Sequence, residues 1–269
     1  MKDPYIDVTN HIGATFEQRM PSRIHVARVW MNMGVRMSAF RETPNSERWN
    51  EHKRLVIGLA LDDGRNYQAR VNMLIQAAEN ANVDAVILPA CTFVHGAKIG
   101  FLGYHLPMKS VLITGALDIT DRTPREYGIA TRDGVIIGEF KCTEICRLEG
   151  KHFTVMAAIS STIKRLTRFP EEEPRDLDTP PRTISSPILL LDAGHHPYSD
   201  HYRRHTLRLA VEAIELRYNA PAAAVLASWQ YATSKPAPSW CVPDKRGSVT
   251  RLIDGDDILD IIEINLTDG

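Results

Sequence analysis

The sequence predicts an α/β protein whose mixed sheet carries helices on its outer faces, and three observations indicate this class. The aliphatic run at 188–193 is followed by residues with helical spacing, which predicts a buried strand and then an amphipathic helix. A strand, a helix and a second strand are predicted in succession over 55–89. Asp133-Gly134 separates two strand-like segments, which is typical of a β-hairpin. Parallel and antiparallel pairs together make a mixed sheet.

The individual elements follow from hydrophobic periodicity. A helix is predicted over 66–80 because apolar residues recur there at every third or fourth position, at Val71, Leu74, Ile75 and Ala78. The helix after residue 193 has the same spacing, at Leu207, Ala210, Val211, Ile214 and Tyr218. Strands are predicted over 55–61, 83–89, 110–117, 127–131, 135–140, 188–193, 222–228, 248–253 and 258–266, the last two as a hairpin.

The N-terminal part lacks this periodicity. We expect 1–53 to be an extension that packs on the domain as an extra hairpin or helix, with a presequence or a partner-binding arm as alternatives. Residues 54–269 are expected to form one domain. The segment 170–187 is rich in proline and acidic residues and is expected to be an exposed loop. The segments 93–108 and 168–187 are expected to shape the entrance of a pocket.

Composition excludes several function classes. The net charge is −1, with 32 basic and 33 acidic residues, so there is no electrostatic case for binding nucleic acid or a membrane surface. No apolar run approaches the roughly 18 residues that a membrane span needs, and the N-terminus does not resemble a signal peptide. The four cysteines have no CxxC spacing and are interpreted as reduced thiols. We therefore expect a cytoplasmic protein.

The junction at residue 193 is the most informative point of the chain. A buried strand stops there and a helix follows, and such junctions at the carboxyl ends of strands are where nucleophiles and ligand contacts lie in α/β proteins. The residue at the junction is Ala193, which has no reactive side chain.

Three stretches in this order resemble the nitrilase superfamily of carbon–nitrogen hydrolases, over roughly residues 54–267. They are VDAVILPA at 83–90, GEFKCTEICRLEG at 138–150 and ILLLDAGHHPYSDHYRR at 188–204. In this superfamily the first ends in Pro-Glu, the second contains a lysine, and the third contains a cysteine at the strand end. The spacing from Lys141 through Cys146 to Glu149-Gly150 is similar to that of aliphatic amidases. Ala90 stands at the family's Glu position and Ala193 at its Cys position.

The resemblance implies a four-layer α-β-β-α sandwich with mixed sheets that forms a homodimer or higher oligomer through the helix after residue 200. It also implies hydrolysis of a small non-peptide amide or nitrile by a Cys-Glu-Lys site, without metal or cofactor. Lys141 would stabilise the developing negative charge, and Glu149 would orient the substrate and assist proton transfer. Gly194, His195 and Trp229 are expected at the substrate, with core packing as the other interpretation of Trp229.

The two alanines leave three interpretations open. The chain is a natural pseudoenzyme of nitrilase fold that binds a ligand or a protein; or the alignment is shifted and another residue serves; or the chain is an inactivated version of an enzyme with Glu at 90 and Cys at 193. We favour the third, because alanine removes a side chain beyond Cβ and is present at both positions while Lys141 and Glu149 remain. Because loss of a nucleophile removes most of the rate, this third interpretation predicts that the chain has no measurable turnover.

Other residues offer weaker alternatives. Cys91 and Cys142 adjoin the site positions, but strand alternation turns neighbouring side chains to opposite faces, so both are expected to point into the core. A metallohydrolase is the third function class, because several metal-binding residue types follow the junction. They are Asp192, His195, His196, Asp200, His201 and His205. No HExxH glutamate accompanies them, so a histidine surface or pocket lining is preferred to a metal site.

Overall fold

The computed structural model describes most of the chain. The described residues are 7–9, 22–34, 53–54, 56, 64–95, 109–120, 124–141, 144–150, 152–159, 184–194, 200–230, 241–242 and 247–265. No helix among them is both long and apolar enough to cross a membrane.

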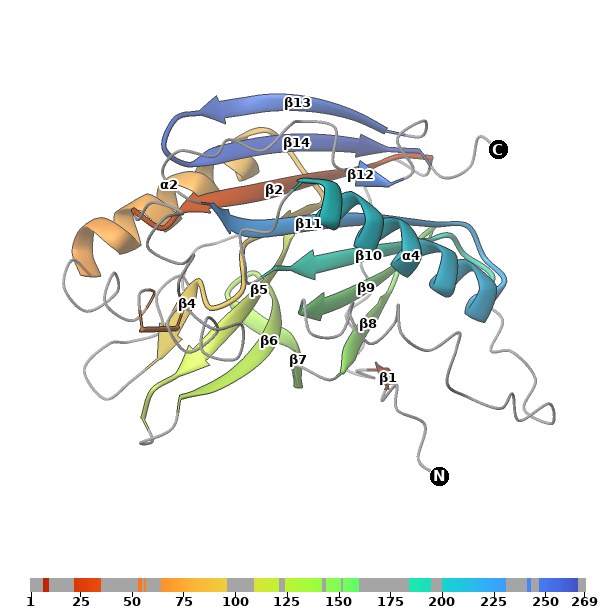
Figure 1. The fold of residues 1–269 in the computed structure, drawn as a ribbon, viewed down its shortest axis with the longest axis horizontal. Coiled ribbons are helices and arrows are strands. Elements are labelled where there is room, and N and C mark those ends of the chain that lie inside the picture. Colours follow the sequence, from red (N-terminus) through yellow and green to blue (C-terminus); the bar gives the residue numbers. More distant parts are fainter. Residues whose placement is uncertain are drawn as a thin grey trace.

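The strands form a mixed sheet in the order β1-β8-β9-β10-β11-β2-β3-β5-β6-β7, with β4 paired to β5, β12 to β11, and the β13–β14 hairpin to β2 (Figure 1). Their bounds are β1 Asp7–Thr9, β2 Ile24–Asn32, β3 Ala85–Ile87, β4 Phe93–His95, β5 Val111–Asp118, β6 Arg125–Arg132, β7 Val135–Lys141, β8 Ile145–Glu149, β9 Thr154–Ile159, β10 Ile188–Ala193, β11 Ala222–Gln230, β12 Cys241–Val242, β13 Gly247–Asp254 and β14 Ile258–Ile264. The two helices with complete bounds are α2 Gly64–Asn80 and α4 Asp200–Tyr218.

Strand β11 joins two halves of this sheet. Its first six residues pair in parallel with all of β10, from Ile188↔Ala222 to Ala193↔Ala227. Its last three residues pair in parallel with the end of β2, from Ser228↔Trp30 to Gln230↔Asn32. One half therefore contains β8, β9 and β10, and the other contains β2, β3, β5, β6 and β7.

Helix α2 covers one outer face. Its apolar stripe, including Leu74 and Ile75, packs in one buried cluster with alternate residues of the β2 half such as Val29 and Leu112. Helix α4 covers the opposite outer face, where Leu207 and Ile214 pack against Ile188, Leu190, Met156 and Ala224 of the β10 half. Figure 1 shows α4 lying over β10 and β11.

The third buried cluster lies between the two halves. From each half it contains the alternate residues of the strands that do not pack against the helix, such as Val26 and Ile113 from one half and Val155 and Leu191 from the other. Because side chains alternate along a strand, each half buries one face against a helix and the other face against its partner half.

Most predicted elements are confirmed, together with the mixed α/β class. The hairpin at 133–134 is present, with positive φ angles of 51° at Asp133 and 73° at Gly134, as its two-residue turn requires. The terminal hairpin is present as β13 and β14.

The predicted strand at 55–61 is wrong at Val56, which has helical backbone, as have Lys53 and Arg54 just before it; the other predicted residues lie outside the described chain. The expected N-terminal extension instead supplies β2, which is hydrogen bonded to β3, β11 and β14. Hydrophobic periodicity did not identify β2, because a strand that is buried on both faces lacks the alternation of apolar and polar residues that marks a half-buried strand. The predicted loop at 93–108 likewise begins with a strand, β4, and its remainder lies outside the described residues.

Candidate functional site

The carboxyl ends of four parallel strands meet at one edge of the sheet. Strands β10, β11, β2 and β3 are neighbours in this order and all run in the same direction. In α/β proteins this edge is where ligands bind. Ala193 ends β10, Gln230 ends β11, and Ala90 follows β3 by three residues. Two of the predicted site positions therefore lie at one edge.

The chain makes direct contact between these two positions. The backbone N–H of Ala90 donates a hydrogen bond to the carbonyl oxygen of Gly194, at 3.0 Å. The N–H of Gly194 donates in turn to the carbonyl of Ala227, at 2.7 Å. Ala90 and Ala193 are both fully buried, in the cluster between the two halves of the sheet. The structure thus brings together the positions at which the family resemblance implies the Glu and the Cys.

The turn that carries Ala90 is fixed by polar side chains. The carbonyl of Pro89 accepts hydrogen bonds from the hydroxyls of Thr92, at 2.6 Å, and Thr114, at 2.9 Å. The indole N–H of Trp229 donates to the carbonyl of Ala90, at 2.7 Å. Buried carbonyl groups need such partners, because leaving one unpaired is costly.

Gly115 on β5 explains how close this turn comes to the sheet. A Cβ atom placed at Gly115 would lie 2.8 Å from two backbone atoms of the turn, the Cα of Ala90 and the N of Cys91. Real Cβ atoms do not approach backbone atoms this closely. The glycine therefore has a packing role at the predicted site, which the sequence alone did not indicate.

Cys91 points into the core and away from the site positions, as expected from the sequence, although residues 90 and 91 lie in a turn and not in a strand. It is fully buried in the cluster on the α2 side, whereas Ala90 belongs to the cluster between the sheet halves. Its Sγ lies 3.5 Å from Oε1 of Glu126. Its φ angle of 59° is unusual for a residue other than glycine, so the surrounding contacts must hold the turn in place. Cys142 lies outside the described residues.

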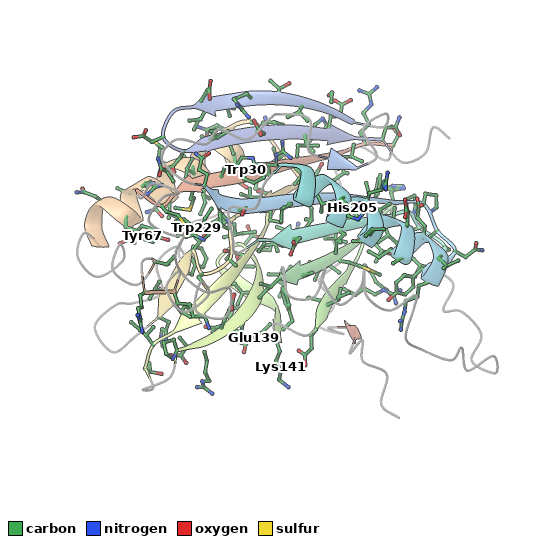
Figure 2. The ribbon with its side chains drawn as sticks, viewed as in Figure 1. Trp30, Tyr67, Glu139, Lys141, His205 and Trp229 are labelled. Carbon is green, nitrogen blue, oxygen red and sulfur yellow. The ribbon has the colours of Figure 1, made fainter. Side chains whose placement is uncertain are left out.

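Lys141 lies elsewhere. It is the last residue of β7, an edge strand, and its side chain is 79% exposed with Nζ 3.5 Å from Oε1 of Glu144. The preceding residue, Phe140, is the one that points into the core between the sheet halves. Figure 2 shows Lys141 at the margin of the molecule, pointing outward. The structure does not bring this lysine to the two alanines.

Glu149 has a similar position. It ends β8, its side chain is 61% exposed, and its carboxylate accepts a hydrogen bond from Arg147, at 2.8 Å. Of the four positions that the resemblance implies for chemistry, two meet in the core and two lie at the solvent-exposed ends of strands.

The remaining predicted residues differ in their positions. Gly194 is described and makes the backbone contacts above, while His195 and His196 lie outside the described residues. Trp229 is fully buried in the α2-side cluster, which favours the core-packing interpretation of this residue. His205 is exposed on α4. Within the described ranges, no group of three or more histidine, cysteine or acidic residues could hold a metal ion.

Asp192 is a buried acid that the sequence analysis assigned only to a metal site. It is 2% exposed, and burial raises its pKa well above the ordinary value for an aspartate. Its Oδ1 atom has no hydrogen-bond partner among the described residues. Because Leu191 and Ala193 face the core between the sheet halves, Asp192 faces the α4 side. The signal in the sequence was an acid within an aliphatic run.

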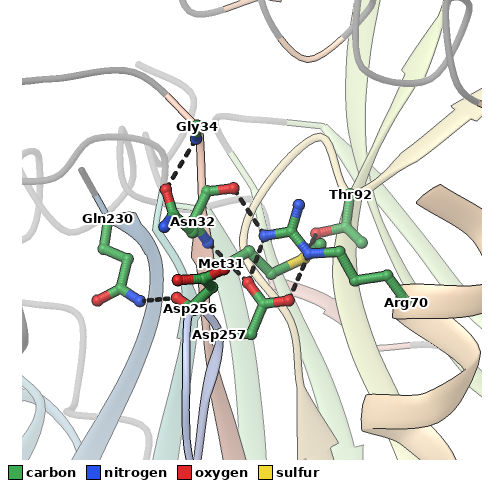
Figure 3. Close-up of polar contacts among 8 residues, drawn as sticks. All are labelled: Met31, Asn32, Gly34, Arg70, Thr92, Gln230, Asp256 and Asp257. Atoms are coloured by element: carbon green, nitrogen blue, oxygen red, sulfur yellow. Dashed lines mark hydrogen bonds and ion pairs between the residues drawn. The ribbon is translucent and has the colours of Figure 1, made fainter. Parts of the chain in front are cut away.

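A cluster of polar side chains lies at the same edge of the sheet, beside α2 (Figure 3). The Arg70 guanidinium forms an ion pair with Asp257, in the turn between β13 and β14, and donates to the carbonyl of Asn32 at 2.6 Å. Gln230 donates to the carbonyl of Asp256, at 2.6 Å. These contacts hold α2, β2, β11 and the hairpin turn together, and they were not predicted because ion pairs between distant segments leave no local pattern.

Comparisons with known proteins find similarity to solved structures only. No family model matches the sequence, and no curated protein matches it either. An amidase of the nitrilase superfamily from Nesterenkonia AN1 has 8% sequence identity and a TM-score of 0.46, over 93% of this chain and 92% of the amidase. A CN-hydrolase superfamily protein from Xanthomonas campestris has 12% identity and a TM-score of 0.42, over 77% of this chain and 76% of that protein.

A glutamine-dependent NAD⁺ synthetase from Acinetobacter baumannii has 13% identity and a TM-score of 0.41, over 77% of this chain. The chain spans only 38% of the synthetase. The chain is thus structurally similar, at low sequence identity, to proteins of the nitrilase superfamily, which its sequence motifs also resemble, and to glutamine-dependent NAD⁺ synthetases.

Proposed function

We propose that this chain has the four-layer α-β-β-α sandwich of a carbon–nitrogen hydrolase and carries that enzyme's site without its base and nucleophile. The observation that supports the proposal is the hydrogen bond from Ala90 to Gly194, at 3.0 Å. It joins the two segments whose motifs resemble the Glu and Cys stretches of the nitrilase superfamily. A sequence resemblance that had arisen by chance would not require these segments to touch.

The chemistry of such a site gives the reason to expect no turnover from this chain. A thiolate attacks the carbon of the amide or nitrile, and a carboxylate takes the thiol proton, since a thiol with a pKa of about 8.5 is mostly protonated at neutral pH. A methyl group at each position can perform neither step. Glu at 90 and Cys at 193 would place a carboxylate and a thiol on two adjacent segments, the turn at 90 and the end of β10, which are joined by the hydrogen bond from Ala90 to Gly194.

A second candidate function is a non-catalytic module of the same fold that binds a ligand or a protein. Two observations favour it. Lys141, the expected cation, is exposed and paired with Glu144. The N–H of Gly194 already donates to Ala227, so this donor beside residue 193 is not available to a developing negative oxygen. On this proposal, restoring two side chains does not restore hydrolysis.

The double variant Ala90→Glu/Ala193→Cys separates the two functions. We would measure the rate of iodoacetamide labelling at each cysteine and hydrolysis of a panel of small aliphatic amides and nitriles. The matched control is Ala223→Cys, which introduces a thiol into the same buried cluster but away from the carboxyl ends of the strands.

A disabled hydrolase predicts that the thiol introduced at position 193 is labelled faster than the four natural cysteines and that an amide or nitrile is hydrolysed. A non-catalytic module predicts labelling at position 193 without hydrolysis. If the thiol at position 193 and the control thiol react equally slowly, residues 90 and 193 do not form a reactive site, and the proposal fails.

The oligomeric state belongs to the same proposal. The outward face of α4 carries Leu216, which is 72% exposed, and we propose that a second copy of the chain covers it. Replacing Leu216 with glutamate is expected to shift the molecular mass in sedimentation equilibrium to that of a monomer. An unchanged mass would exclude this face as the dimer contact.

A further inference from the structure

We infer that Trp229 is a positioning residue that holds residue 90 opposite residue 193. The inference rests on the proposed function, because it concerns the geometry of the same two positions. Trp229 itself does not touch a reacting group, since its ring is fully buried on the α2 side of the sheet.

Strand β11 contacts both positions, and it does so in two ways. Its backbone holds the end of β10, because the carbonyl of Ala227 accepts the N–H of Gly194 at 2.7 Å. Its side chain holds the turn at 90, because the indole N–H of Trp229 donates to the carbonyl of Ala90 at 2.7 Å. Ala227 and Trp229 are separated by one residue, so the spacing between the end of β10 and the turn at 90 is set by a short, fully buried piece of a single strand.

The turn at 90 depends on such support. Cys91 has a φ angle of 59°, in the left-handed region that residues other than glycine adopt only when their surroundings impose it. The Thr92 and Thr114 hydroxyls fix the carbonyl of Pro89. Among the described side chains, the indole of Trp229 is the one shown bonding to the next carbonyl, that of Ala90. Without it, this buried carbonyl loses its partner and the turn can shift away from residue 193.

The chain offers a matched control for the loss of an indole donor. Trp30 on β2 is also fully buried, and its indole N–H donates to Oδ2 of Asp260 at 3.3 Å. Asp260 belongs to β14, a strand that contains neither of the two site positions. Trp229→Phe and Trp30→Phe therefore remove the same kind of group from the same sheet, but only the first removes it from the predicted site.

The first test uses the chain without restored side chains. Amide hydrogen exchange is measured by NMR for the N–H of Ala90 and for the amides of the β6–β7 hairpin. In Trp229→Phe, exchange of the Ala90 amide is expected to accelerate by about tenfold or more relative to the hairpin amides, because only the local turn opens. Trp30→Phe should leave the ratio unchanged. If each variant accelerates exchange of the Ala90 amide and of the hairpin amides by the same factor, Trp229 is only a core residue and the inference is overturned.

The second test measures position through electrostatics. In Ala90→Glu/Ala193→Cys, the neighbouring carboxylate shifts the pH profile of iodoacetamide labelling at position 193 relative to Ala193→Cys alone. Adding Trp229→Phe is expected to remove at least about half of that shift, while adding Trp30→Phe preserves it. A shift that survives Trp229→Phe contradicts the inference.

The two tests fail independently of the proposed function. Loss of amide protection in Trp229→Phe supports the positioning role even when the double variant hydrolyses nothing. Hydrolysis by the double variant, combined with equal effects of Trp229→Phe and Trp30→Phe, supports the hydrolase proposal and rejects the positioning role.

Discussion

Residues 90 and 193 lie in very different surroundings from residues 141 and 149, although the same family motifs predict all four positions as one site. Ala90 and Ala193 are fully buried and joined through backbone hydrogen bonds. Lys141 and Glu149 have side chains that are 79% and 61% exposed, and each pairs with a neighbour in its own segment. The two buried positions are thus held by tertiary contacts, and the two exposed ones by local contacts.

The direction of the strands explains this difference. Residues 90 and 193 follow β3 and β10, whose carboxyl ends are brought to one edge by the parallel pairing through β11 and β2. Lys141 and Glu149 end β7 and β8, which have antiparallel partners in β6 and β9. An antiparallel strand presents its carboxyl end beside a neighbour's amino end, so the pairing does not collect functional residues at one edge.

The largest effect is expected from Gly115→Ala, which breaks the buried region directly. The new Cβ would lie 2.8 Å from backbone atoms of the turn at 90, so the turn has to move. We expect the free energy of unfolding to fall by up to about 3 kcal/mol, as for other overpacked cores. Urea denaturation measures this change.

Gly255→Ala is the control, because an added Cβ there meets its nearest atom, the Asp257 carbonyl oxygen, at 3.7 Å. If the free energy of unfolding falls by the same amount in both variants, the close approach of the turn at 90 is not the reason why Gly115→Ala destabilises the protein.

An intermediate effect of opposite sign is expected from Asp192→Leu. Burial raises the pKa of Asp192, so between the pKa of the unfolded chain, about 3.9, and the higher folded pKa, the folded protein binds more protons than the unfolded one. The stability of the unmodified chain therefore falls as pH rises above about 4. Replacing the acid with leucine removes this slope and is expected to stabilise the protein at neutral pH by about 1–2 kcal/mol.

The comparison is sharpened by Glu149→Leu, which makes the same change at an exposed position. It is expected to give no stability gain, because the side chain of Glu149 is 61% exposed and its carboxylate accepts a hydrogen bond from Arg147. Thermal unfolding measured between pH 4 and pH 8 distinguishes the two variants, and a parallel pH dependence in both would mean that Asp192 is hydrated in solution.

The smallest effect is expected from Lys141→Ala. Its ion pair with Glu144 is exposed, and exposed pairs contribute little. Glu144 also keeps its hydrogen bond from the backbone N–H of residue 141, at 2.8 Å. The free energy of unfolding should change by less than about 0.5 kcal/mol. A loss above about 2 kcal/mol in urea denaturation would instead indicate a buried lysine.

The sequence by itself determined the local elements and the order of the motifs. The spacing of Val71 and Leu74 was sufficient for α2, and Asp133-Gly134 was sufficient for the β6–β7 hairpin, because both signals depend on residues close together in the chain. The junction at 193 was found for the same reason. Strand β2 was missed, because its central place depends on pairing with residues 258–264 and 228–230.

Only the tertiary structure decided which predicted residues share a site. Parallel pairing brought Ala90 to Gly194, and packing required Gly115 and the indole of Trp229 beside them. The side-chain direction of Lys141 was decided by Phe140, which occupies the inward-facing position next to it. Sequence motifs record residue types and their order, whereas the direction of each side chain depends on strand register and burial, which are set by contacts between distant segments.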